Sequence, residues 1–152
     1  ADLGTSFANA WNGASNMTTF ACPFDVASSA ANLSAAWASC SSLTSFPLLN
    51  TSSGTNFDYA WYKCSSLADF PANMFDTTGT LMSSAFTNAW RNCTLTTQSI
   101  ENILVSLDTN GATGIALGIH GGTNAAKTTW SATAVTAYDN LIVKGWTISF
   151  NA

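Results

Sequence analysis

The chain has 152 residues, which is enough for one domain with a sizeable buried core, and 47% of them are hydrophobic, a share that excludes intrinsic disorder. Charged residues make up only 8%, against about 25% in ordinary soluble domains, and the net charge is −4. So few basic residues offer no patch that could neutralise phosphates, and we expect no nucleic-acid partner. Ser, Thr and Asn interrupt the uncharged stretches throughout, so we also expect no membrane insertion.

One octet recurs four times with the consensus F-x-x-A-W-x-x-C. Its tryptophans lie 26, 24 and 29 residues apart, and the copies occupy residues 7–14, 33–40, 57–64 and 86–93. The fixed positions i, i+3, i+4 and i+7 match the apolar stripe of two helical turns. The spacing therefore predicts four short helices whose other four positions point away from the core.

A second pattern follows each of the first three octets. It has apolar residues at its first, fourth and sixth positions and covers residues 17–22, 43–48 and 67–72. The fourth and sixth positions have the period of a strand, and polar turn residues come next. A repeat of this length with L-x-x-L-x-L spacing is typical of leucine-rich repeats. We predict an α/β fold, a right-handed solenoid with short parallel strands and short helices.

Beyond the fourth octet the pattern changes to longer elements. The apolar spacing predicts, in chain order, a helix through Ile100, Ile103, Leu104 and Leu107 that ends at Gly111, a strand at 115–119, a turn at Gly121 and Gly122, a helix at about 129–144 closed by Gly145, and a last strand at 146–150. We therefore assign residues 1–96 to about four repeats and residues 97–152 to larger capping units of the same solenoid.

The start of the chain has no comparable cap, because the repeat pattern is already running at Phe7. Terminal repeats normally shield the core side chains of a solenoid. At this N-terminal edge we expect either further repeats of a longer parent chain or a partner subunit.

Two motifs of the form A-W-x-x-C-S-S-L-x-x-F-P, at 36–47 and 60–71, resemble the BspA-like leucine-rich repeats of bacterial surface proteins and some phage virion proteins. The closing run 140–150 looks like the C-terminal cap often attached to them, so the resemblance covers nearly the whole chain. It implies a right-handed solenoid, a location outside the cell, on the cell surface or on a virion, and a role in recognition or adhesion. It implies no catalytic residues. The first repeat departs from the pattern, with Ala14 in place of Cys.

The cysteines and the single histidine are the residues with the most reactive side chains, and neither group is arranged as a catalytic or metal site. Cys40, Cys64 and Cys93 share one repeat position, so we expect a buried ladder of free thiols, although neighbouring coils would be close enough for a disulfide. Their spacing is unlike that of a zinc site, and no cofactor is indicated. His120, the single histidine, has no nucleophile or acid placed beside it by any motif, so we expect a surface histidine and no enzyme.

The outward octet positions vary most, and they carry Asn, Tyr, Ser and Arg rather than the Lys and Glu of drifting surfaces. That set of side chains supplies adaptable hydrogen bonds and aromatic contacts, as in antibody combining sites. The candidate ligand-binding residues, richest in the third and fourth repeats, are Asp58, Tyr59, Tyr62, Lys63, Asn88 and Arg91, with Asn12 in the first.

These observations favour an extracellular or virion-surface module that binds a cell-surface protein or glycan. The alternative is a structural spacer or assembly unit of a fibre or virion with no ligand of its own. A weaker third idea is a Thr-rich face that binds an ordered surface such as ice, because the Thr array is irregular by the third repeat.

Overall fold

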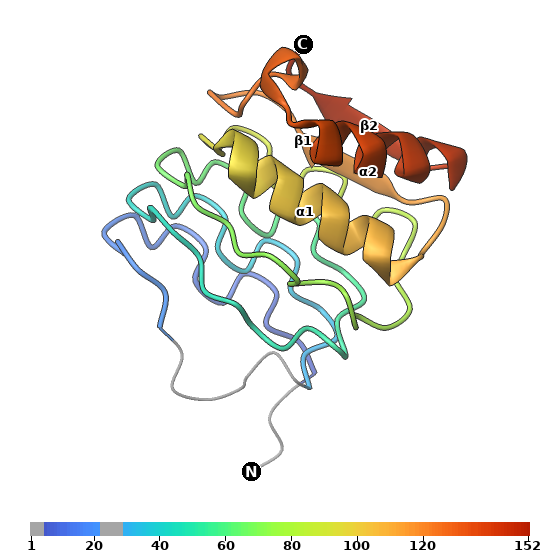
Figure 1. Ribbon diagram of the computed structural model, residues 1–152. Coiled ribbons are helices and arrows are strands. Elements are labelled where there is room, and N and C mark those ends of the chain that lie inside the picture. Colours follow the sequence, from blue (N-terminus) through green and yellow to red (C-terminus); the bar gives the residue numbers. More distant parts are fainter. Residues whose placement is uncertain (1–4, 22–28) are drawn as a thin grey trace.

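The computed structural model describes residues 5–21 and 29–152 (Figure 1). It is a mixed α/β structure in which all regular elements of the described residues follow residue 96. In chain order these are α1 (Thr97–Asn110), β1 (Ala116–Ile119), the 3-10 helix η1 (Lys127–Thr129), α2 (Ala132–Val143) and β2 (Thr147–Phe150).

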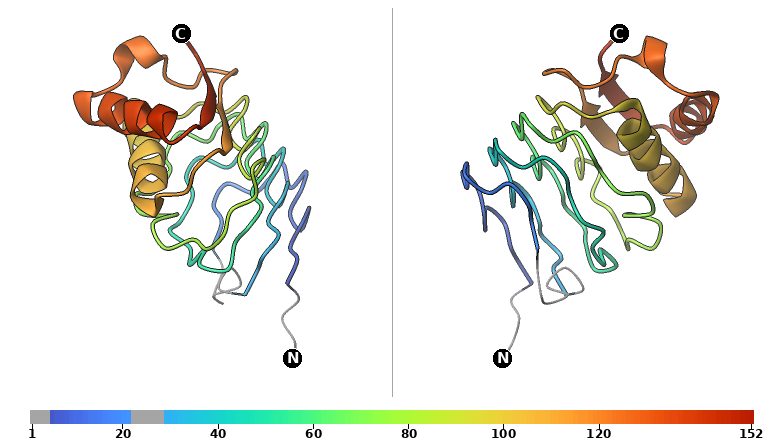
Figure 2. Two further views of the ribbon diagram at one scale, coloured as in Figure 1. Left: turned by 90° about the vertical axis from the view of Figure 1, so that its right-hand side faces the viewer. Right: turned by 60° about the vertical axis from the view of Figure 1, so that its left-hand side comes forward.

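The part of the chain before α1 runs as successive coils that lie side by side (Figure 2). Parallel backbone bridges join neighbouring coils at two places, through Ser6, Asn32 and Asn56 and through Thr19, Ser45 and Asp69. We number the coils 1 to 4 by the octet that each contains. A bridge between Phe86 and Leu117 then joins coil 4 to β1.

The octets are not the short helices that their spacing predicts. Each is a run of tight turns in which an N–H donates to the carbonyl three residues back, as Ala10 does to Phe7 and Ala14 to Trp11, both at 3.1 Å. The third residues of these two turns, Asn9 and Gly13, have φ of 60° and 79°, as type II turns require. Consecutive turns place positions 1, 4, 5 and 8 on one side just as a helix does, so the apolar spacing does not separate the two.

The turns leave alternate N–H groups free to reach the next coil. The Trp11 N–H donates to the Ala36 carbonyl at 2.7 Å, and in the next coil Trp37 donates to Ala60 at 2.9 Å. In a helix these N–H groups would bond within the octet. Stacking by main-chain hydrogen bonds therefore excludes the helical alternative.

The strands predicted after the octets are also shorter than expected. Each contributes a single bridge residue, and these residues are Thr19, Ser45 and Asp69. Pro47 and Pro71 follow the inward phenylalanines and carry no N–H, so the pairing cannot continue past them. Cys22, at the end of the first predicted strand, lies outside the described residues.

Stacked aromatic rings fill the space inside the coils. Successive indole rings of one column lie 5.4, 5.5 and 4.9 Å apart with planes within 7° of parallel, and the column consists of Trp11, Trp37, Trp61 and Trp90. A second column of Phe20, Phe46 and Phe70 meets it edge-on, with Phe70 4.9 Å from Trp61 at 80°. The prediction that the tryptophans face the core is confirmed for the last three, which are at most 1% exposed.

The C-terminal elements confirm their predictions closely. α1 is capped at its start by Thr96, whose side-chain oxygen accepts the Ser99 N–H, and at its end by Gly111 with φ of 82°. β1 and β2 pair in parallel, with Leu117 opposite Ile148. α2 starts later than predicted, because Ser131 caps it.

The helix α1 is held to coil 3 by polar side chains rather than by its apolar stripe alone. The hydroxyl oxygens of Ser99 and Ser106 each accept a main-chain N–H at 2.8 Å, from Phe70 and Phe75 respectively. α2 packs against α1, and no helix in the described part of the chain is long and apolar enough to cross a membrane.

We expect Trp61→Ala to lower the free energy of unfolding by about 3–5 kcal/mol, and Trp11→Ala by about half as much. Trp61 is buried between two stacked indoles, whereas Trp11 is half-buried at the edge of the column. Urea unfolding of both variants measures the difference. Equal losses of unfolding free energy in the two variants would show that a tryptophan inside the column stabilises the core no more than one at its edge.

Candidate functional site

The outward positions of the octets form one surface, which we call the turn face. Of the seven predicted ligand-binding residues, six lie in the adjacent coils 3 and 4, and these are Asp58, Tyr59, Tyr62, Lys63, Asn88 and Arg91. Asn12 lies in coil 1, with coil 2 between, and its side-chain amide donates to Asn9 Oδ1 at 3.0 Å. The turn face of coils 3 and 4 therefore contains the candidate site without Asn12.

Two tyrosines and two cations form the accessible part of this site. The ring centroids of Tyr59 and Tyr62 are 5.2 Å apart, with the planes at 86°, and the Lys63 Nζ lies 5.2 Å from the Tyr62 ring centroid. Tyr59 is 39% exposed, and Lys63 and Arg91 are exposed as well. The Lys63 N–H donates to the Arg91 carbonyl at 2.9 Å, which fixes the two cationic residues side by side. We call these four residues the tyrosine–cation cluster.

Asp58 and Asn88 instead join coil 3 to coil 4. Asp58 Oδ1 accepts the Asn88 N–H at 3.0 Å, and the Asp58 N–H donates to Asn56 Oδ1 at 3.0 Å. Both residues are half-buried. They position the cluster rather than offer it a further contact.

The cluster contains two of the chain's four basic residues. The other two are occupied elsewhere: Lys144 pairs with Asp108 at 2.6 Å, and the Lys127 Nζ lies 3.6 Å from the Tyr138 ring centroid. Lys63 and Arg91 make no ion pair within residues 5–21 and 29–152. Two positive charges thus lie beside two tyrosines in a chain whose net charge is −4.

His120 extends this surface, which sequence reasoning missed. The Asn92 N–H donates to the His120 carbonyl at 3.0 Å, so the end of β1 lies beside coil 4. Partial burial and the nearby Arg91 charge lower the pKa of His120 below its usual value. No motif places His120 near Arg91, because their proximity depends on the register between coil 4 and β1.

The backbone at the cluster is strained. Tyr59 and Lys63 both have φ of 59°, a conformation that costs a residue with a Cβ about 1–2 kcal/mol. In coil 1 the position of Lys63 is occupied by Gly13, the residue that adopts this conformation most easily. Coil 2 has the same backbone conformation at these positions with Ala35 and Ser39, so the conformation belongs to the repeat, and coil 3 differs in placing large side chains there.

The described cysteines confirm the predicted ladder of buried free thiols. Each Sγ donates to the tryptophan carbonyl of the preceding coil, Cys40 to Trp11 at 3.2 Å, Cys64 to Trp37 at 3.1 Å and Cys93 to Trp61 at 3.0 Å. Burial raises the pKa of Cys93 to about 12, so this thiol keeps its proton at neutral pH. The hydrogen bond from this protonated thiol to a carbonyl therefore has a structural role, because the reactive form of cysteine is the thiolate.

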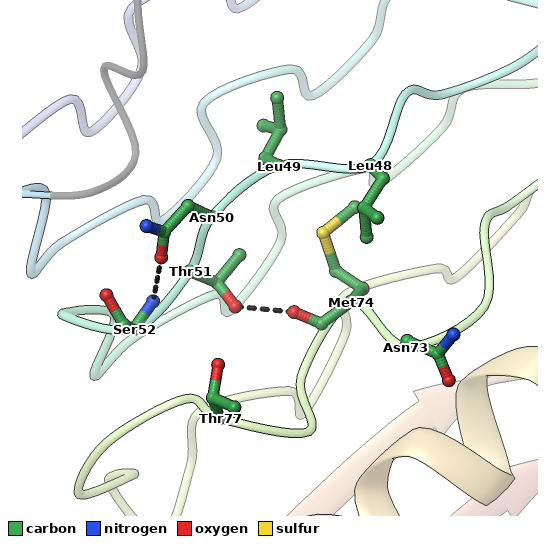
Figure 3. Close-up of a pocket in the computed structure, with 8 residues that line it drawn as sticks. All are labelled: Leu48, Leu49, Asn50, Thr51, Ser52, Asn73, Met74 and Thr77. Carbon is green, nitrogen blue, oxygen red and sulfur yellow. Dashed lines mark hydrogen bonds between the residues drawn. The ribbon is translucent and has the colours of Figure 1, made fainter.

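A hollow of about 480 Å³ lies on another part of the surface, between residues 48–52 and 73–77 (Figure 3). The Leu48 side chain lies near that of Met74 at one side of it, and the Thr51 hydroxyl donates to the Met74 carbonyl at 2.6 Å. No charged residue lines it. This hollow therefore offers a ligand no ionic contact, whereas the cluster offers the Lys63 and Arg91 side chains.

No family model, no curated protein and no solved structure matches this chain. Among the described residues, no three His, Cys, Asp or Glu side chains form a group that could hold a metal ion. The chemistry of the turn face is therefore that of its own side chains: aromatic surfaces, hydroxyls and two cations.

We expect Lys63→Gly to raise the free energy of unfolding by about 0.5–1 kcal/mol, because relief of the left-handed strain exceeds the entropy cost of glycine. Lys63→Ala is the matched control, since it removes the same charge but keeps the strain. Chemical denaturation of both variants gives the comparison. If the glycine variant were no more stable than the alanine variant, the strain would not exist.

Proposed function

We propose that this chain is a recognition module that binds a cell-surface protein or glycan through its turn face, on the outside of a cell or on a virion. The observation that supports this best is the tyrosine–cation cluster of coils 3 and 4. It gathers one exposed and one half-buried ring with two cations that make no ion pair among the described residues, and Tyr59 and Lys63 have the left-handed backbone that glycine adopts most easily.

The proposal includes the finer fold, a right-handed leucine-rich-repeat solenoid of the BspA-like kind with repeats over 1–96 and capping units over 97–152. The stacked coils, the two rows of parallel bridges and the tryptophan column support it. In such a rod the octets of successive coils supply one continuous surface, which suits an extended partner.

The side chains of the cluster suit a ligand with both apolar and anionic groups. Tyr59 and Tyr62 offer ring faces and hydroxyls at little entropy cost, and Lys63 and Arg91 attract carboxylates. Main-chain hydrogen bonds hold the coils on both sides of the cluster, so binding orders little additional backbone. The proposal does not include catalysis, because no hydrogen bond joins the His120 side chain to a nucleophile or a carboxylate within the described residues.

We expect the triple variant Tyr59→Ala, Tyr62→Ala, Arg91→Ala to lose binding to intact cells and to an array of neutral and carboxylate-bearing glycans. Its melting temperature should change little, since Tyr59 and Arg91 are exposed, where substitutions usually alter stability by less than about 0.5 kcal/mol each, and Tyr62 is only half-buried. Binding of the labelled chain and thermal unfolding are measured in parallel.

The matched control is Asp139→Ala, Ile142→Ala, Val143→Ala, which removes exposed apolar area and one charge from α2. It should bind as the unmodified chain does. Unaltered binding by the turn-face variant would discard this face, and an unmodified chain that binds neither cells nor glycans would favour the spacer role instead.

A further inference from the structure

The free edge of coil 1 presents main-chain carbonyls at alternate positions. No hydrogen-bond donor among the described residues reaches four of them, those of Ser6, Ala8, Ala10 and Asn12. The equivalent four carbonyls of coil 2 accept N–H groups of coil 1 at 2.7–3.0 Å, and those of coil 3 accept N–H groups of coil 2 at 2.7–2.9 Å. Coil 1 therefore repeats an acceptor row that is filled in both of the following coils.

The apolar side of the same edge is incomplete as well. Trp11 is half-buried, whereas Trp37 and Trp61 are 1% exposed. Three further coil 1 residues at inward repeat positions are also half-buried, namely Phe7, Ala14 and Met17. One side of the tryptophan column thus remains accessible next to the carbonyl row.

We propose that this edge is a docking surface for one further polypeptide coil that carries an F-x-x-A-W-x-x-C octet. Such a coil supplies N–H groups at alternate positions and an indole at the stacking distance, as coil 1 does for coil 2. The surface continues the interfaces that already join coils 1, 2 and 3. It is distinct from the turn face and does not depend on the recognition role.

The same geometry disfavours a symmetric pair of this chain through these edges. A two-fold axis that passes through the octets would place the carbonyl row of one copy against the carbonyl row of the other. Acceptors cannot hydrogen-bond to acceptors, so main-chain groups would be buried without partners, which is unfavourable. The occupant must bring donors.

Ala14 would make the contact between coil 1 and a docked coil differ from the contacts between the coils of this chain. At each internal joint a thiol donates to the tryptophan carbonyl of the preceding coil, as Cys40 does to Trp11 at 3.2 Å. Ala14 occupies the Cys position of coil 1 and has no donor. Ala14→Cys should therefore strengthen the joint to a docked coil and have no such partner in the chain without one.

The test adds one coil by fusing a copy of residues 33–55 directly ahead of Ser6, so that the copied Thr55 replaces the identical Thr5. We expect one cooperative unfolding transition, a melting temperature at least about 5 °C above that of the unmodified chain, and a larger denaturant m-value. Ala14→Cys should raise the melting temperature further in the fusion but not in the unmodified chain.

The control fusion carries Trp37→Ser in the added copy only, and it should lose most of the gain. The proposal is overturned if the fusion melts at the temperature of the unmodified chain while a protease removes the added segment and leaves the rest intact. It is equally overturned if the unmodified chain forms an oligomer that Trp11→Ser dissociates, since a second copy would then occupy the edge.

Discussion

The structure depends on the way each octet divides its main-chain N–H groups. One set closes tight turns within the coil, and the alternating set crosses to the next coil, as the Trp37 N–H does to Ala60. This division holds neighbouring coils at close to the separation of paired strands, about 4.8 Å. Flat aromatic rings stack well at nearly that distance, and for this reason the same repeat can place a tryptophan in every coil.

The close stacking buries indole N–H groups without hydrogen bonds, which is unfavourable, but the packing of the rings stabilises the fold by more than this. The indole N–H groups of Trp37, Trp61 and Trp90 have no hydrogen-bond partner in the described part of the chain, and each buried unpaired donor costs about 1–3 kcal/mol. Removing a fully buried tryptophan typically costs about 3–5 kcal/mol, so each ring still stabilises the column. The cysteines supply hydrogen bonds to other buried main-chain groups, because each thiol donates to a tryptophan carbonyl of the coil before it.

Sequence reasoning predicted the C-terminal elements well because their signals are local. Gly111 marks the end of α1 by its backbone freedom, whereas the side-chain cap of Ser131, which sets the start of α2, was missed. The octets were misjudged because an apolar stripe at i, i+3, i+4 and i+7 serves a run of turns as well as a helix. The left-handed positions gave little warning, since Asn9 and Gly13 suit them but Ala35 and Tyr59 do not.

Some features of the candidate site could likewise be predicted from the sequence, and others could not. The exposure of Tyr59, Lys63 and Arg91 follows from their octet positions and could be read from the repeat. The use of Asp58 to hold Asn88 depends on the register between two coils, as does the placing of His120 beside Arg91, and spacing along the chain does not determine it.

The proposed recognition surface and the stacking surface are thus different parts of one repeat. The turn face varies from coil to coil, whereas the main-chain groups at the coil 1 edge repeat a pattern that does not depend on side-chain identity. The claim beneath both is that alternate N–H groups leave the octet, and NMR couplings across hydrogen bonds test it directly. The account predicts a coupling from the Trp37 N–H to the Ala60 carbonyl. A coupling from the Trp37 N–H to the Leu33 carbonyl would show a helical octet and contradict it.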